Sequence, residues 1–272
     1  MQIEEKMRLF YDNTVISWHE HVWESAPGVL NEEGCDTLVE GAKKLGFNKI
    51  VCSTPIADDP LCPPEDFCRV NKVVKAAMDR HPDFIEGMAF VNAGYFKEAI
   101  NEVRHCVEDL GMCGVKLYHH YFINEPVLFP LIETCIDLDI PILMHAGKSM
   151  NAKHHADQPR LSGGSEFADI AKRYPEATFI QAHIGGGGDW QWHIDALEDA
   201  KNVFLDVGGT VYDSQMIERC VKQLGADRIV FATDGVYFAA TGRILGADIT
   251  EEEKKTILAG TRLQKFLKRG IL

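Results

Sequence analysis

The amino-acid sequence predicts an α/β fold, a single (β/α)8 TIM barrel that spans residues 1–272 as one domain. Short apolar runs alternate with longer helical patterns along the chain, and there are eight such runs. Side chains able to bind a metal end four of these runs, including the first and the last, and closing a barrel brings the first and last strands side by side. A doubly wound open sheet is the alternative, but it would set those two strands farther apart.

The predicted strands are continuous apolar runs, as expected for parallel strands that are covered on both faces. The first run ends in Ile16-Ser-Trp-His19-Glu-His21, and the last reads Ile229-Val-Phe-Ala-Thr-Asp234. The predicted strands are residues 15–21, 49–54, 84–91, 114–118, 140–145, 178–183, 203–206 and 228–234.

Helices are predicted between the strands from capping residues and from apolar positions three to four residues apart. Asn31 can cap a helix that Gly46 ends, and Thr250 with Glu253 reads as a capping box. The predicted helices are residues 31–45, 64–80, 94–110, 126–138, 162–174, 189–200, 212–224 and 250–269. No internal repeat or linker interrupts the pattern, so one domain is the simplest organisation.

Composition excludes several classes of function. The formal net charge of −13 and the absence of a Lys/Arg stripe argue against nucleic-acid binding. No apolar run is long enough to cross a membrane, and the first residues lack the apolar stretch of a signal peptide. Most of the eight cysteines lie in apolar helices or strands, which suits reduced thiols in the cytoplasm. We expect a cytoplasmic protein with a small-molecule substrate, and a homo-oligomer is an open alternative to a monomer.

Four histidines and one aspartate form the main functional pattern. His19 and His21 are two residues apart on a strand, so both side chains point to the same side and can hold one cation. His145, His183 and Asp234 each end a separate apolar run. A lone histidine at a strand end is usually a hydrogen-bonded core residue. The whole set, however, favours a metal centre at the C-terminal mouth of the barrel.

With these motifs the chain resembles the amidohydrolase superfamily, and within it the branch that contains aminocarboxymuconate-semialdehyde decarboxylase and related hydrolases. The matching motifs cover nearly the whole chain and are His19-Glu-His21, Gly114-Val-Lys116-Leu, His145-Ala-Gly, Ala182-His183-Ile-Gly-Gly, Thr233-Asp234 and Ile257-Leu-Ala-Gly-Thr-Arg262-Leu. Members often carry an acid two residues before the first histidine, and Ser17 stands there in this chain.

The resemblance implies one zinc ion per chain, or another divalent metal, held by His19, His21, His145 and Asp234. It also implies a metal-bound water with which Asp234 exchanges a proton, while His183 polarises the reacting group, orients the water or acts as general acid. In relatives with two metals, His183 becomes a ligand and a lysine of the fourth strand is carbamylated. Lys116 occupies that strand, so a second metal stays open.

Two cationic side chains are candidate substrate ligands. Lys116, if it is unmodified, would bind a substrate carboxylate or pair with an acid. Arg243, past the last strand, is a carboxylate anchor by charge type. The loops over residues 54–64 and 147–160 follow strands at the functional face, so we expect them to contact substrate.

The leading functional prediction is a metal-dependent hydrolase, in which metal-activated water cleaves an amide, ester or lactone bond. A non-oxidative decarboxylase of an aromatic or unsaturated carboxylate is the alternative on the same scaffold. A third alternative is a barrel that binds metal without catalysing a reaction. Released carbon dioxide, as opposed to a product that retains every carbon, separates the first two.

Overall fold

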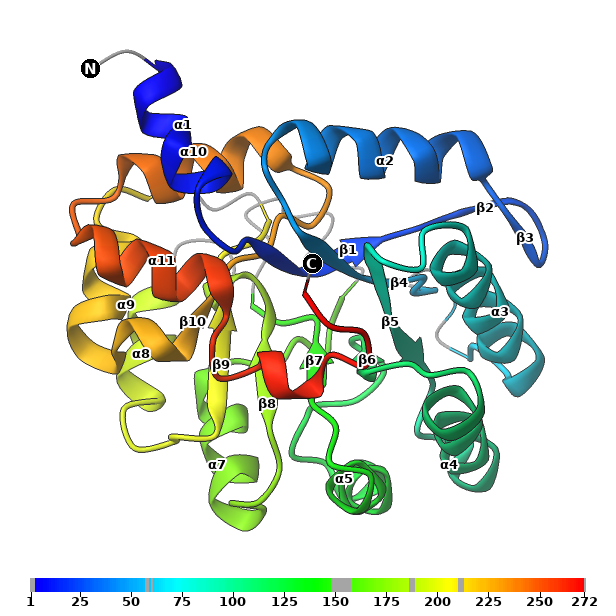
Figure 1. The fold of residues 1–272 in the computed structure, drawn as a ribbon. Helices are drawn as coiled ribbons and strands as arrows, with labels where there is room; N and C mark the ends of the chain where they lie inside the picture. The colour runs from blue at the N-terminus through cyan, green and yellow to red at the C-terminus, as the bar shows by residue number, and fades with distance from the viewer. Residues whose placement is uncertain are drawn as a thin grey trace.

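Eight parallel strands form one sheet that curves into a barrel (Figure 1). The computed structural model describes residues 3–56, 59, 61–147, 158–185, 189–209 and 213–271. In chain order the strands of this sheet are β1 (Ile16–His21), β4 (Lys49–Ser53), β5 (Ile85–Phe90), β6 (Gly114–Leu117), β7 (Ile142–Met144), β8 (Phe179–Gln181), β9 (Val203–Asp206) and β10 (Ile229–Val230). Each strand pairs in parallel with the next, which confirms the predicted (β/α)8 barrel.

Two backbone hydrogen bonds join β1 to the segment that follows β10. Trp18 N donates to Phe231 O at 3.0 Å, and Asp234 N donates to His19 O at 2.9 Å. The first and last strands therefore lie side by side and nearly close the barrel. This closure is what brings functional groups from the two ends of the chain together.

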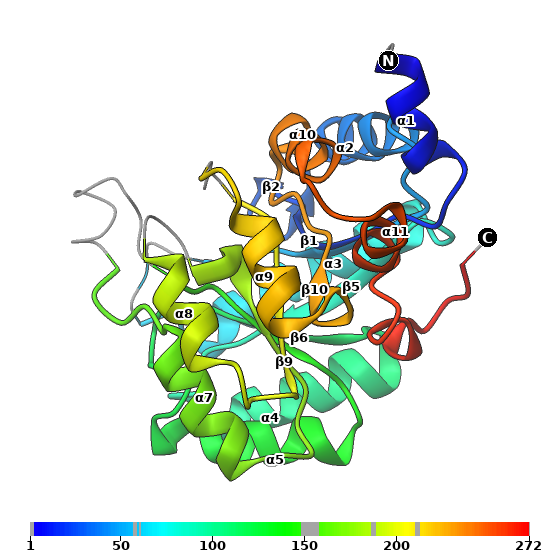
Figure 2. The same ribbon diagram turned by 90° about the vertical axis from the view of Figure 1, so that its left-hand side faces the viewer.

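Helices surround the strands on the outside (Figures 1 and 2). They are α1 (Ile3–Tyr11), α2 (Glu32–Lys44), α3 (Pro64–Arg80), α4 (Phe96–Arg104), α5 (Phe129–Asp137), α7 (Gly164–Arg173), α8 (Trp190–Ala196), α9 (Met216–Leu224), α10 (Tyr237–Gly246) and α11 (Glu251–Ala259). A short hairpin, β2 (Glu24–Ala26) and β3 (Val29–Leu30), precedes α2. Within the described ranges, no helix is both long and apolar enough to cross a membrane.

The observed helices depart from the predicted set at the two ends of the chain. Helix α1 and helix α10 were not predicted, and the predicted last helix stops at Ala259. Gly260 ends α11 because it adopts a left-handed φ of 55°, which favours glycine. The chain then continues as a short 3₁₀ turn (Gln264–Phe266).

Apolar side chains fill the barrel and close one of its ends. Leu263 and Phe266, from the C-terminal segment, pack into the interior cluster at the end where the strands begin, and Figure 1 shows this segment in red crossing that end. The strand residues of the cluster include Ile16, Trp18, Val51, Met88, Leu143, Ile180, Phe204 and Val230, and Cys113 and Ala182 lie directly beside strands. The polar ends of the strands lie at the opposite end, which is the mouth.

Candidate active site

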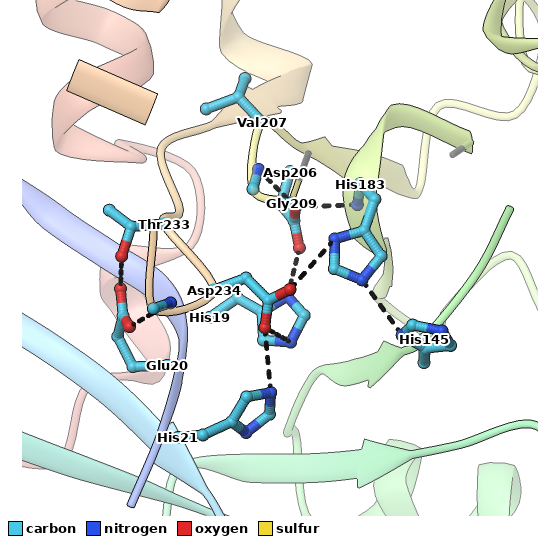
Figure 3. A network of polar contacts seen from close by, with 12 residues as sticks. His19, Glu20, His21, His145, His183, Asp206, Val207, Gly209, Thr233 and Asp234 are labelled. Carbon is cyan, nitrogen blue, oxygen red and sulfur yellow. Dashed lines mark hydrogen bonds and ion pairs between the residues drawn. The ribbon is translucent and has the colours of Figure 1, made fainter. Parts of the chain in front are cut away.

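A bulge in β1 turns two histidines toward the mouth. Between Ser17 and Glu20, the register of β1 against β4 shifts by one residue. Because of the extra residue, Trp18 packs into the interior cluster while His19 and His21 also point to the inner side (Figure 3). Bulges of this kind commonly re-aim side chains next to active sites.

Asp234 comes from the other end of the chain and meets these two histidines. Its φ of 49° is left-handed, and Gly235 follows with a φ of 74°. Oδ1 of Asp234 lies 3.1 Å from Nε2 of His21 and 3.6 Å from Nε2 of His19. The strained turn therefore aims the carboxylate at the two rings (Figure 3).

Glu20, between the two histidines, fastens the Asp234 turn to β1. Its Oε1 accepts from Ser17 Oγ at 2.7 Å and from Thr233 Oγ1, and its Oε2 accepts from Gly235 N at 3.0 Å. Burial raises the pKa of Glu20 to about 7, against the opposing effect of these hydrogen bonds. Ser17, which stands where relatives often carry an acid, is thus a hydrogen-bond donor to a neighbouring acid.

Two further histidines lie across the mouth from β1. His183 has a left-handed φ of 65°, and its Nε2 lies 3.1 Å from Nδ1 of His145. Nδ1 of His183 is buried and has no hydrogen-bond partner within the described part of the chain, although it lies 3.8 Å from Oδ2 of Asp234. The His145 ring stacks on Tyr118 at a centroid distance of 4.3 Å, and its Nε2 lies 3.3 Å from Oε1 of Gln158.

Lys116 places a buried amine next to the first histidine. It lies in β6, is fully buried, and its Nζ is 2.5 Å from Nε2 of His19. Burial lowers the pKa of Lys116 to about 8, while Asp234 and Asp206 act in the opposite direction. This amine therefore loses its proton more easily than an exposed lysine does.

The imidazoles of His19, His21 and His145 favour the neutral form. Burial, followed by the charge of Lys116, lowers the pKa of His19 to about 4. Burial also lowers the pKa of His21, and burial with a neighbouring imidazole holds the pKa of His145 well below its ordinary value. Burial opposes ionisation of Asp234, but His19 and His21 outweigh it and keep the pKa of Asp234 well below its usual range. The site thus offers ring lone pairs and an ionised carboxylate.

These donors fit a divalent metal ion. One nitrogen each from His19 and His21 and one oxygen of Asp234 lie within 4.8 Å of one another. Two imidazoles and a carboxylate are a common set for Zn²⁺, Mn²⁺ and similar ions. The unpartnered Nδ1 of His183 borders the same space. His145 does not join this group in the described residues, because its nitrogens face His183 and Gln158, and its role as a ligand stays a prediction.

The structure adds Asp206, which the sequence analysis missed. Asp206 ends β9, is fully buried, and its Oδ2 lies 2.9 Å from Nδ1 of His19. Burial raises its pKa, but the neighbouring His19 and His183 outweigh burial and lower it to about 2. The signal was present, because Val203-Phe-Leu-Asp206 is an apolar run that ends in a carboxylate, like the runs that were singled out.

Arg243 lies in α10 and holds the segment that follows Asp206. Its guanidinium donates to Val207 O, and to Gly209 O at 3.1 Å. Its role as a substrate anchor stays a prediction. Of the loop predicted to contact substrate over residues 147–160, residues 148–157 lie outside the described part of the chain.

A pocket of about 190 Å³ opens beside the proposed metal ligands. Its lining residues are His21, Val22, Trp23, Asn31, Gly34, Cys35, Leu38, Asp234 and Gly235. A larger cleft of about 800 Å³ lies at the other end of the barrel, between α7, α8 and the C-terminal segment, and none of the site histidines lines it. Of these two cavities, the smaller one borders the proposed metal ligands His21 and Asp234.

Comparison with known proteins places this chain in a family. A family model described as amidohydrolase matches residues 63–261. A 2-keto-4-carboxy-3-hexenedioate hydratase from Sphingobium sp. is 25% identical over 241 residues, which cover 72% of this chain and 70% of the hydratase. A 2-amino-3-carboxymuconate-6-semialdehyde decarboxylase from Dictyostelium discoideum is 21% identical over 234 residues, which cover 72% of this chain and 64% of the decarboxylase.

Solved structures share the fold. A dihydroxybenzoic acid decarboxylase from Polaromonas sp., with bound manganese and the inhibitor 2-nitroresorcinol, superposes with a TM-score of 0.70 at 19% identity. The match covers 94% of this chain and 97% of that one. At this level of identity the likeness supports the barrel fold.

These comparisons correct one prediction. The expectation of a hydrolase of amides, esters or lactones is wrong, because the relatives are decarboxylases and a hydratase. Neither of these reactions hydrolyses such a bond. The alternative, a non-oxidative decarboxylase, agrees better with the relatives. The Polaromonas structure holds manganese, so the comparisons do not specifically support the predicted zinc.

Proposed function

The chain belongs to the amidohydrolase family, and we propose that it is a metal-dependent decarboxylase of a small aromatic or unsaturated carboxylate. The observation that carries this proposal is the convergence of His19, His21 and Asp234 on one point at the barrel mouth. Decarboxylases among the relatives support the choice of reaction.

We expect one divalent ion per chain, held by His19, His21 and Asp234, with His145 and His183 as neighbouring donors. Manganese is the first ion to test, because a manganese ion is bound in the Polaromonas structure, and zinc is the second. An unmodified Lys116 would repel a second cation from the His19 side of the site. A carbamylated Lys116 would instead allow two metals, with His183 as a ligand.

The reaction replaces a carboxyl group by a proton. A bound divalent ion would orient the oxygen atoms of the substrate and stabilise negative charge on them. The bond between the carboxyl carbon and its neighbour breaks, carbon dioxide leaves without the bonding electrons, and the neighbouring carbon keeps that pair and takes up a proton. We propose that His183 and Asp234 relay this proton, with the ionised Asp234 as the group that accepts it and passes it on, because Nδ1 of His183 is buried and lies 3.8 Å from Oδ2 of Asp234.

The substrate would lie between a buried cation and an apolar pocket. The amine of Lys116 is placed to pair with the substrate carboxylate. On the other side, Val22, Trp23 and Leu38 line the 190 Å³ pocket, and its lining residues, all within the described ranges, include no lysine or arginine. We therefore propose that the remainder of the substrate is a compact, uncharged planar group that packs against Trp23.

Hydration of a carbon–carbon double bond is the second candidate. The specific observation that favours it is the 25% identical hydratase, which acts on an unsaturated carboxylate, as its name states. The same residues would then deliver water and a proton across the double bond, and no carbon would be lost.

The test is a substrate screen in D₂O with the manganese-loaded and metal-stripped protein. We expect release of carbon dioxide from a hydroxybenzoate or an unsaturated carboxylate, with one deuterium at the carbon that lost the carboxyl group. Activity should vanish on metal removal and return with Mn²⁺. Addition of deuterium and oxygen without loss of carbon would assign the hydratase reaction. Carbon dioxide release that persists after complete metal removal would contradict the proposal.

A further inference from the structure

We propose that Asp206 is a positioning residue, which acts through His19 by fixing the orientation and tautomer of its ring. The carboxylate would hold Nδ1 of His19 as the protonated nitrogen, so that the lone pair of Nε2 points to the metal. The inference deepens the proposed function, because it concerns how the chain builds the metal site. It does not depend on which reaction the site catalyses.

In the hydrogen bond between Asp206 and His19, the histidine is the donor. Oδ2 of Asp206 lies 2.9 Å from Nδ1 of His19, and both residues are buried, with at most 1% of the side chain exposed. An ionised carboxylate can only accept a hydrogen bond, so Nδ1 of a neutral ring must donate. The other nitrogen, Nε2, is then unprotonated, and it is the one that faces Oδ1 of Asp234 at 3.6 Å. Metal-binding histidines are commonly oriented in this way by a carboxylate.

The second oxygen of Asp206 is also fully used, so the carboxylate cannot rotate freely. Oδ1 accepts from His183 N at 2.8 Å and from Gly208 N at 2.9 Å. The backbone of His183 is left-handed, with φ 65° and ψ 22°. One buried carboxylate thus ties the ring from β1 to the strained turn after β8 (Figure 3).

Arg243 fixes the segment from which Asp206 projects. Its guanidinium donates to Val207 O and Gly209 O, the carbonyls on either side of Gly208. This segment also approaches the site closely, because a Cβ atom at Gly209 would lie 2.8 Å from Nδ1 of His183. Arg243, the segment after β9, Asp206 and His19 therefore form one continuous set of contacts that ends at the metal position.

The competing role is direct metal ligation by Asp206. One atom each from His19, His183 and Asp206 also lie within 4.8 Å of one another. The carboxylate, however, occupies Nδ1 of His19, whereas Asp234 and Lys116 lie at Nε2. The two nitrogens of an imidazole point in divergent directions, so a metal at Nε2 would not be shared with Asp206. This difference can be tested.

The primary variant is Asp206→Asn, measured by titration of the metal-free protein with Mn²⁺. The amide oxygen of Asn can still accept from His183 N and Gly208 N, but its NH₂ group cannot accept from Nδ1 of His19. We expect Mn²⁺ affinity to fall by roughly 10- to 100-fold. Asp199→Asn is the matched control, because it removes the same charge from an exposed position, and it should change the affinity less than about twofold.

Two further measurements separate positioning from a structural or ligand role. In the metal-free wild type, nitrogen NMR should show His19 protonated at Nδ1, and Asp206→Asn should shift the population toward the Nε2-protonated form. In a His19→Ala background, Asp206→Asn should change Mn²⁺ affinity less than about twofold, because the residue through which Asp206 acts is gone. An unchanged tautomer with unchanged Mn²⁺ affinity in the single variant would overturn the proposal. A further large loss of affinity in the His19→Ala background would also overturn it and assign direct ligation.

Discussion

Oδ1 of Asp234 lies 3.1 Å from Nε2 of His21, although the two residues stand near opposite ends of the chain. The hydrogen bond from Asp234 N to His19 O holds the two residues close, because it fixes the turn after β10 beside the bulge of β1. Glu20 fastens the same turn through Gly235 N. The contacts that close the barrel are therefore the same contacts that bring the site residues together.

The variant His21→Ala should lose metal affinity while the barrel stays folded. His21 is one of the three residues of the candidate metal group. Loss of a residue that only hydrogen-bonds to a metal ligand typically lowers metal affinity 10- to 100-fold, so loss of His21 itself should lower Mn²⁺ affinity by at least that much. Isothermal titration with Mn²⁺ measures this change. His105→Ala is the control, because His105 is half exposed and pairs with Asp109 on the surface. Wild-type affinity in His21→Ala would remove His21 from the metal site.

The variant Asp234→Asn should lose turnover more than it loses metal. The amide oxygen can still coordinate an ion, but Asn cannot accept and return a proton. We expect kcat to fall by roughly 10²- to 10⁴-fold at saturating Mn²⁺, with metal content near one per chain. Metal analysis of the same sample used for kinetics makes the comparison direct. A near-wild-type kcat at full metal occupancy would exclude Asp234 from proton transfer.

The variant Trp23→Ala should raise KM for the substrate found in the screen and leave Mn²⁺ affinity unchanged. Trp23 lines the pocket beside His21 and Asp234, and an aromatic stacking contact contributes roughly 0.5–1.5 kcal/mol, or up to about tenfold in KM. Tyr11→Ala is a matched control, because its ring is exposed to a similar degree on α1. An equal KM for both variants would show that the substrate does not contact Trp23.

The cysteines should be slow to react in the folded protein. All eight are free thiols, and burial raises the pKa of Cys35 to about 11 and of Cys62 and Cys68 to about 12. A pKa above its usual range leaves the thiol protonated at pH 7–8, and the thiolate is the reactive form. We expect a thiol reagent at pH 8 to modify few cysteines in the native state and all eight in denaturant. Rapid native modification of several thiols would contradict the described burial.

The sequence predicted the barrel because buried parallel strands produce continuous apolar runs, which are visible without a structure. It could not predict where the strand pairing ends. The last predicted strand, 228–234, pairs with β9 only over Ile229–Val230 in the described structure, and the residues that follow bond to β1 instead and reach a left-handed Asp234. The predicted strand 178–183 likewise ends at Gln181, before the left-handed His183.

The site was predicted only in part, because the sequence shows the spacing of its residues but not their contacts. The spacing of His19 and His21 placed both rings on one side, and barrel closure brought Asp234 to them. The bulge that also turns Trp18 inward has no signature in the apolar pattern. Asp206 ends a predicted strand as Asp234 does, but it was missed because the sequence does not show that its partner is His19.

A crystal structure of the manganese-loaded protein, with anomalous data collected at the manganese edge, would test the proposed metal site directly. We predict one peak at the barrel mouth, about 2.0–2.3 Å from Nε2 of His19, Nε2 of His21 and an oxygen of Asp234. A protein fully loaded with manganese whose anomalous peak lies away from these three side chains would contradict it.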